Sequence, residues 1–118
     1  MTTVQLSLFP ELDDAVGCVY FGLALDGRIK IGSTCRPIKY RGGELRIRVL
    51  LTIPGGELDE HRYHRRYKAE RINGSEWFHP TNRLLLDLHA LCAEHGQNGS
   101  AQLIHAILTS RLSQAVAA

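Results

Sequence analysis

Apolar and polar residues alternate along the first half of the chain in three short segments. Residues 17–25 are rich in β-branched and aromatic residues, and the pair Asp26-Gly27 predicts a tight turn back into residues 28–33. In this second segment isoleucines alternate with basic residues, so that one face of the strand is apolar and the other is cationic. Residues 46–53 predict a third strand, which a proline and two glycines close.

The second half of the chain carries patterns that are typical of helices. Residues 57–72 place acidic residues first and basic residues later, which matches the helix dipole. Residues 81–95 carry an apolar stripe of leucines, and residues 100–114 predict a last helix. Residues 76–78 form a short extended piece, whereas residues 36–44 are ambiguous between a short helix and a loop.

These elements together predict an α/β fold with a small, three-stranded, mainly antiparallel sheet flanked by helices. We expect a tail over residues 1–14, one domain over residues 15–95 and an extra C-terminal helix over residues 96–118. No apolar run approaches the ~18–20 residues of a membrane span, and no secretory signal is visible. The three cysteines include no C-x-x-C pair, so a cytoplasmic location with reduced thiols is expected.

The charge of the chain is concentrated in its middle. The net charge is only +2, but residues 28–71 hold 12 of the 14 Lys and Arg and 5 of the 12 Asp and Glu. A basic middle in a nearly neutral protein indicates a surface that faces a polyanion such as nucleic acid. An ordinary solvated helix face with basic strand edges is the alternative interpretation.

A stripe of residues on the predicted helix 57–72 contains a candidate for chemistry. Glu60, Tyr63, Tyr67 and Arg71 follow one another at the spacing of one helix face. The tyrosines favour a face turned toward the sheet, which places the Glu60 carboxylate at the edge of the core, where it needs a partner. The alternative is a helical pair with His64 that contributes ~0.3–0.5 kcal/mol.

The hairpin supplies a second candidate. Tyr20 lies in the middle of the first strand, opposite the strand that carries Arg28 and Lys30. Near a bound metal ion, a tyrosine can accept a proton from water, a single carboxylate can hold Mg²⁺, and an arginine can bind two phosphate oxygens at once. The alternative is that Tyr20 is simply a core aromatic residue.

Four motifs follow one another through the middle of the chain: Val19-Tyr20-Phe21, Lys30-Ile31-Gly32, Glu60-x-x-Tyr63-His64 and Gly74-Ser75-Glu76-Trp77-Phe78. Their order and spacing resemble the GIY-YIG nuclease superfamily, in its compact phage-type branch, over roughly residues 17–90. The resemblance implies a GIY-YIG-like fold and an endonuclease that hydrolyses DNA phosphodiester bonds with Mg²⁺ or Mn²⁺. It also implies the cytoplasm of a bacterial or phage-infected cell.

The resemblance implies a role for each matching residue. Tyr20 matches the tyrosine that takes a proton from the attacking water, and Glu60 matches the glutamate that binds the metal ion. The catalytic arginine of the family lies on a short helix after the second motif. In this chain that position makes Arg41 the candidate and Arg36 the second choice.

Three further positions have roles that the resemblance leaves open. Lys30 stands where the second motif often has a tyrosine, although the phage-type branch often has lysine there, and it is expected to assist at the phosphate or the base. His64 either contacts the phosphate or caps the edge of the sheet through a hydrogen bond. Trp77 and Phe78 are expected to fill the core.

The basic side chains expected to contact DNA are Arg28, Arg36, Lys39, Arg46, Arg65 and Arg71. Since Lys30 replaces a family tyrosine, a non-catalytic nucleic-acid-binding module on the same fold is the first alternative. Such a module would bind nucleic acid in a salt-sensitive way without cleaving it.

The N-terminal tail carries a separate motif. Gln5-Leu6-Ser7-Leu8-Phe9 resembles the peptide by which bacterial replication and repair proteins dock on the sliding clamp. Leu8 and Phe9 would enter an apolar pocket while Gln5 and Leu6 complete the contact. The alternatives are that these residues pack on their own domain, or that the chain is a clamp-tethered adaptor without catalytic activity.

Overall fold

The computed structural model of the chain describes residues 17–35 and 46–117. The chain divides into two compact units, Met1–His79 and Pro80–Ala118. The division falls inside the span 15–95 that the sequence pattern assigns to one domain, so that both C-terminal helices belong to the second unit.

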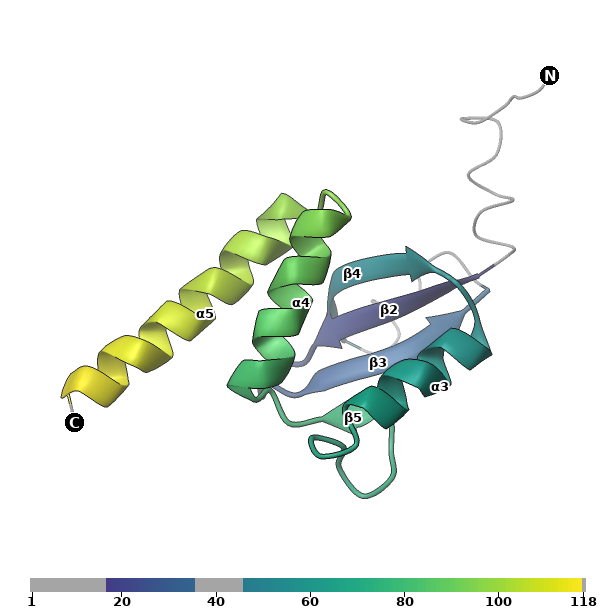
Figure 1. The fold of residues 1–118 in the computed structure, drawn as a ribbon, viewed down its shortest axis with the longest axis horizontal. Helices are drawn as coiled ribbons and strands as arrows, with labels where there is room; N and C mark the ends of the chain where they lie inside the picture. The colour runs from purple at the N-terminus through teal and green to yellow at the C-terminus, as the bar shows by residue number, and fades with distance from the viewer. Residues whose placement is uncertain (1–16, 36–45, 118) are drawn as a thin grey trace. The chain divides into compact units, whose positions relative to one another are not determined.

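The first unit contains an antiparallel sheet with the strand order β4-β2-β3-β5 (Figure 1). Its strands are β2 (Cys18–Leu23), β3 (Ile29–Thr34), β4 (Arg48–Pro54) and β5 (Trp77–Phe78). The α/β class and the antiparallel pairing are confirmed, but the described residues form four strands rather than the predicted three. The additional strand exists because the extended piece pairs with β3, which places Phe78 opposite Ile29 and Trp77 opposite Lys30.

The register of β2 and β3 sorts their side chains onto two faces, because directly opposed residues of antiparallel strands share a face. Tyr20 lies opposite Gly32, and Lys30 lies on the same face two positions earlier in β3. We call this the Tyr20 face. Phe21 and Ser33 lie on the other face, which we call the α3 face.

Helix α3 (Glu57–Arg66) packs on the α3 face, alongside β3 in Figure 1. The ring of Tyr63 meets the ring of Phe21 edge-on, with 5.2 Å between the ring centroids. At the start of the helix, the Asp59 carboxylate accepts a hydrogen bond of 3.0 Å from the Gly56 N–H and so satisfies a backbone donor. The acidic first turn and basic last turn follow the helix dipole as predicted.

Helix α3 ends at Arg66, earlier than the predicted span 57–72. The backbone N–H groups of Lys68, Glu70 and Arg71 each donate to the carbonyl three residues back, which is the spacing of tight turns rather than of an α-helix. The predicted stripe is therefore wrong for Arg71, which lies beyond the helix in a bridge with Phe78.

The buried apolar residues of the first unit come from all four of these strands and from the turn after α3. They are Val19, Tyr20, Phe21, Ile29, Ile31, Leu50, Leu51, Tyr67 and Phe78. Phe78 fills the core as predicted, whereas Trp77 is only partly buried. The core thus continues from the sheet to its edge at β5.

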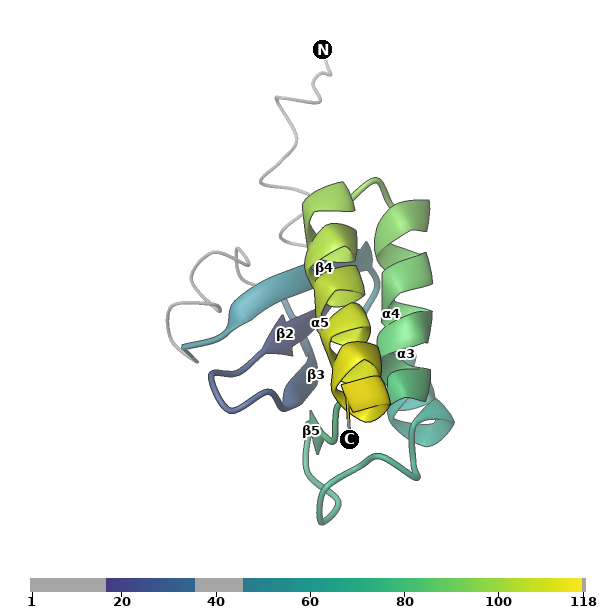
Figure 2. The ribbon, with the colours of Figure 1, turned by 90° about the vertical axis from the view of Figure 1, so that its left-hand side faces the viewer.

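The second unit consists of two helices that lie side by side (Figures 1 and 2). Helix α4 (Asn82–Glu94) begins where the Thr81 hydroxyl accepts a hydrogen bond of 3.2 Å from the Leu84 N–H. Helix α5 (Asn98–Ala117) starts before the predicted residue 100 and extends beyond residue 114. None of the helices in the described part of the chain has the length and apolar character that a membrane span requires.

Candidate functional site at the edge of β3

Strand β5 pairs with only the first part of β3, and this leaves an edge at which several polar side chains gather. The N–H of Ile31 donates to the Glu76 carbonyl at 3.0 Å, and beyond that point no strand among the described residues pairs with this edge. Nε2 of His64 donates to the carbonyl of Ile31 at 2.9 Å. Because a carbonyl only accepts, Nε2 carries a proton. The prediction that His64 caps the sheet edge is confirmed.

Glu60 reaches the same edge from α3. Its side chain is buried, and its Oε1 accepts a hydrogen bond of 2.5 Å from the Ser33 hydroxyl. Its Oε2 lies 3.4 Å from Nε2 of His64. The alternative interpretation, a helical pair between Glu60 and His64, is therefore present in the structure, and it is buried, since both residues are only 5% exposed. A buried carboxylate of this kind is retained at the cost of desolvation, which its partners offset.

Glu76 lies at this edge between Lys30 on the Tyr20 face and Glu60 on the α3 face. Its Oε1 accepts a hydrogen bond of 2.6 Å from the Lys30 ammonium. Burial acts to raise the pKa of Glu76, but the bond and charge of Lys30, a hydrogen bond with Glu60 and the charge of His64 hold it below its ordinary value. Two carboxyl groups thus lie near the same edge, Glu76 bonded to Lys30 and Glu60 beside His64.

Sequence reasoning assigned no role to Glu76. It lies in the terminal motif, directly before Trp77 and Phe78, which are expected only to fill the core. The sole signal that could have identified it is the pairing of the extended piece with β3, which aligns Trp77 with Lys30 and brings Glu76 to the same edge. We call Lys30, Ser33, Glu60, His64 and Glu76 the β3 edge cluster.

Tyr20 packs on the Tyr20 face, directly over the glycine of the second motif. A methyl group at Gly32 would lie 2.6 Å from the Tyr20 hydroxyl oxygen, so the absence of a side chain at this position makes room for the phenol. Tyr20 is fully buried. Tyr20 and Lys30 occupy one face of β3 while Glu60 and His64 occupy the other, and the cluster connects them only around the edge.

The structure gives different surroundings to the basic residues expected to contact DNA. Arg28 forms an ion pair of 2.7 Å with Asp26, and its guanidinium lies 4.5 Å from the centroid of the Trp77 ring. Nε of Arg71 donates to the Ser75 carbonyl at 2.6 Å and holds the loop before β5.

Arg46 and Arg65 are exposed on the surface. Arg36, Lys39 and Arg41 lie outside the described residues, as do Gln5, Leu6, Leu8 and Phe9 of the tail.

A hollow of about 320 Å³ borders the cluster at Ser33. Its described lining comes from the end of β3 and from the segments before β2 and at the start of α3. These residues are Gly17, Ser33, Thr34, Cys35, Gly55, Gly56 and Glu57. Much of this lining is glycine, so the hollow gives access to the backbone next to Ser33.

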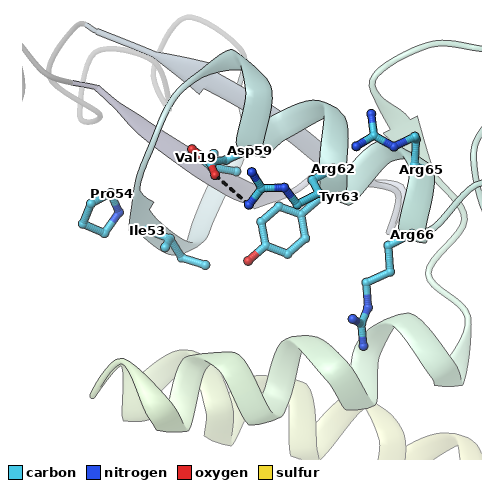
Figure 3. Close-up of a pocket in the computed structure, with 8 residues that line it drawn as sticks. All are labelled: Val19, Ile53, Pro54, Asp59, Arg62, Tyr63, Arg65 and Arg66. Carbon is cyan, nitrogen blue, oxygen red and sulfur yellow. Dashed lines mark hydrogen bonds and ion pairs between the residues drawn. The ribbon is translucent and has the colours of Figure 1, made fainter.

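A larger pocket of about 510 Å³ has described lining from β2, β4 and α3 (Figure 3). The described lining is Val19, Ile53, Pro54, Asp59, Arg62, Tyr63, Arg65 and Arg66, and it contains no member of the β3 edge cluster. Figure 3 shows Arg62 turned toward Asp59, with which it forms an ion pair of 3.2 Å. This pocket is therefore distinct from the β3 edge cluster. Three of its described lining residues are arginines, whereas the cluster contains one lysine.

The carboxyl groups of Glu60 and Glu76 suit a hard cation, because Mg²⁺ and Mn²⁺ prefer oxygen ligands. Within residues 17–35 and 46–117, no group of three or more His, Cys, Asp or Glu side chains is arranged to hold a metal ion. Mg²⁺ commonly takes only one or two carboxylates and fills its other positions with water and phosphate oxygens. Glu60 and Glu76 supply the one or two carboxyl groups that this requires.

All three cysteines lie within the described residues, and none of them forms a disulfide. Burial raises the pKa of the Cys92 thiol.

Comparison of the chain with protein-family models, curated proteins and solved structures finds no match.

Proposed function

We propose that the chain is a metal-dependent endonuclease that hydrolyses DNA phosphodiester bonds, in the manner of the GIY-YIG nucleases. The observation that carries the proposal is the β3 edge cluster. There a buried carboxylate, a second carboxylate and a lysine meet beside Gly32, on which the hydroxyl of Tyr20 packs. The motifs that resemble the family supply the rest of the support.

Hydrolysis forms a bond between the water oxygen and phosphorus, breaks the bond to the leaving oxygen, and moves a proton from the water to a base. Tyr20 is the proposed base: as the phenolate, its oxygen takes that proton, and the leaving oxygen takes a proton from solvent. The ammonium of Lys30 would neutralise charge that develops on the phosphate oxygens. Arg41 is proposed as a second phosphate ligand.

Glu60 and Glu76 are the residues that would hold Mg²⁺ or Mn²⁺, and His64 with Ser33 keeps Glu60 in place. When bound, a divalent cation supplies positive charge next to the phosphate. His64 acts here as a positioning residue, since its Nε2 already donates to Ile31. Recruitment to a bacterial sliding clamp through residues 5–9 is proposed as the route to the substrate.

A second candidate function is a non-catalytic nucleic-acid-binding module, and one observation favours it. Tyr20 has no exposed surface, and a base must contact the water that it deprotonates. In such a module the phenol would only fill the space over Gly32. The two candidates differ in whether a metal-dependent product forms.

The proposal is tested by incubating purified protein with supercoiled plasmid and with branched DNA, in Mg²⁺, Mn²⁺ or EDTA. We expect nicking in the presence of metal that disappears in EDTA and in Glu60→Ala. Glu57→Ala is the matched control, because Glu57 is an exposed acidic residue on the same helix. Circular dichroism melting checks that both variants fold. No cleavage by the wild-type protein with either metal would favour the binding module.

A further inference from the structure

The two side chains of the Lys30–Glu76 ion pair differ in burial, so that Lys30 is held in place while the Glu76 side chain can turn. The Lys30 side chain is 12% exposed, whereas the Glu76 side chain is 45% exposed. The ammonium of Lys30 also lies 5.4 Å from the centroid of the Trp77 ring, which attracts a cation to its face. Lys30 therefore keeps its position when the Glu76 carboxylate turns away.

The backbone of Glu76 is held in place independently of its side chain. Its carbonyl accepts the 3.0 Å hydrogen bond from the Ile31 N–H, and Trp77, the next residue, pairs with Lys30 in the sheet. Rotation of the side chain alone can thus release Lys30 without breaking β5. Because the Glu76 carboxylate is nearly half exposed, solvent screens its attraction to Lys30 and the release costs little.

A carboxylate and a phosphodiester present the same feature to a lysine, namely an anionic oxygen that accepts a charge-assisted hydrogen bond. Lysine binds either one as a point charge and requires no fixed orientation of its partner. A DNA phosphate at Lys30 would therefore meet the Glu76 carboxylate as a direct competitor, with repulsion between the two anions.

We propose that Glu76 occupies, in the DNA-free protein, the place on Lys30 that a phosphate of the DNA takes in the complex. The inference rests on the proposed function, because it assumes that DNA binds at the β3 edge. Glu76 thereby lowers the affinity for any polyanion that fails to displace it. It acts as a built-in competitor that selects for a phosphate positioned at the edge of β3.

The experiment measures binding of a fluorescently labelled branched DNA oligonucleotide by anisotropy, in EDTA and at fixed salt, so that cleavage plays no part. We expect Glu76→Gln to bind roughly two- to fivefold more tightly than the wild type. Glu94→Gln is the control, because it removes the same negative charge at an exposed residue of α4. The gain over this control should disappear when Lys30→Met is also present.

Equal affinities for Glu76→Gln and Glu94→Gln overturn the inference, and so does a gain that persists without Lys30. Either result beside metal-dependent cleavage by the wild type leaves the nuclease proposal standing. Absence of binding by every variant overturns the inference as well, and the plasmid assay alone then decides the nuclease proposal. Glu76→Asp keeps the charge and shortens the side chain, so it serves as a second variant if Glu76→Gln melts early. A smaller gain in the same direction is expected from it.

Discussion

At the scale of single residues, two contacts hold the ammonium of Lys30 in the candidate site. It bonds to the Glu76 carboxylate at 2.6 Å and lies near the face of the Trp77 indole. Arg28 approaches the same indole at 4.5 Å. The two cations share one aromatic ring at the edge of the sheet, and each is also paired with a carboxylate, Arg28 with Asp26 and Lys30 with Glu76.

The pKa of Glu76 predicts how the stability of the protein depends on pH. Despite desolvation, which raises it, the charge and hydrogen bond of Lys30 help to hold this pKa below its ordinary value of 4.5. A depressed pKa contributes stability that is complete above the unfolded value and is lost as the pH falls through the folded value. Because Glu76 is nearly half exposed, we expect a contribution of only ~0.2–1 kcal/mol.

Urea unfolding of the wild type and Glu76→Gln in EDTA, at about pH 7 and about pH 3, measures this contribution. The wild type should lose more stability than the variant on going to the lower pH. An equal loss in both proteins would show that the Lys30–Glu76 pair contributes nothing to folding.

At the scale of elements, the pairing of β2 with β3 depends on a glycine opposite a tyrosine. Tyr20 and Gly32 are directly opposed, and the phenol extends over the glycine. The same register therefore forms the backbone hydrogen bonds between the two strands and leaves space for the ring of Tyr20 over Gly32. It also sets where β5 attaches, because β5 pairs with Ile29 and Lys30 of the same strand.

Gly32→Ala is expected to destabilise the protein by ~1–3 kcal/mol, because the new methyl group would lie 2.6 Å from the Tyr20 hydroxyl and force the ring to shift. Gly99→Ala is the control, since it lies in α5 with no atom within 4 Å of the added carbon and should stabilise the helix slightly. Urea unfolding measures both. A Gly32→Ala protein as stable as the wild type would mean that Tyr20 is loosely packed.

The sequence predicts most of these elements, because their signals are local. The turn pair Asp26-Gly27 and the alternation on either side of it locate β2 and β3 to within two residues at each end. The end of α3 is not predicted, since the tight turns after Arg66 interrupt a stretch with helical periodicity. Glu76 could not be recognised as a site residue because its contacts come from strand pairing between residues far apart in the chain.

At the scale of the whole molecule, the distribution of charge supports a polyanionic partner. The middle of the chain, residues 28–71, carries a balance of +7 within a protein of net charge +2. The described lining of the larger pocket adds three arginines, Arg62, Arg65 and Arg66, to the cations beside Trp77. Binding to DNA should therefore weaken steeply as salt is raised, by counterion release.

The central claim is that residues on both faces of β3 act as one hydrolytic site. The measurement that tests it most directly is the rate of plasmid nicking in Mg²⁺ by the wild type, Tyr20→Phe and Glu60→Gln, with melting temperatures recorded for each. Tyr20→Phe removes only a hydroxyl from the Tyr20 face, and Glu60→Gln removes only a charge from the α3 face. We predict that each folded variant loses about 100-fold or more in rate, as expected for a proton-transfer group and a metal ligand. Cleavage by Tyr20→Phe at the wild-type rate would contradict the account and leave Tyr20 as a core residue.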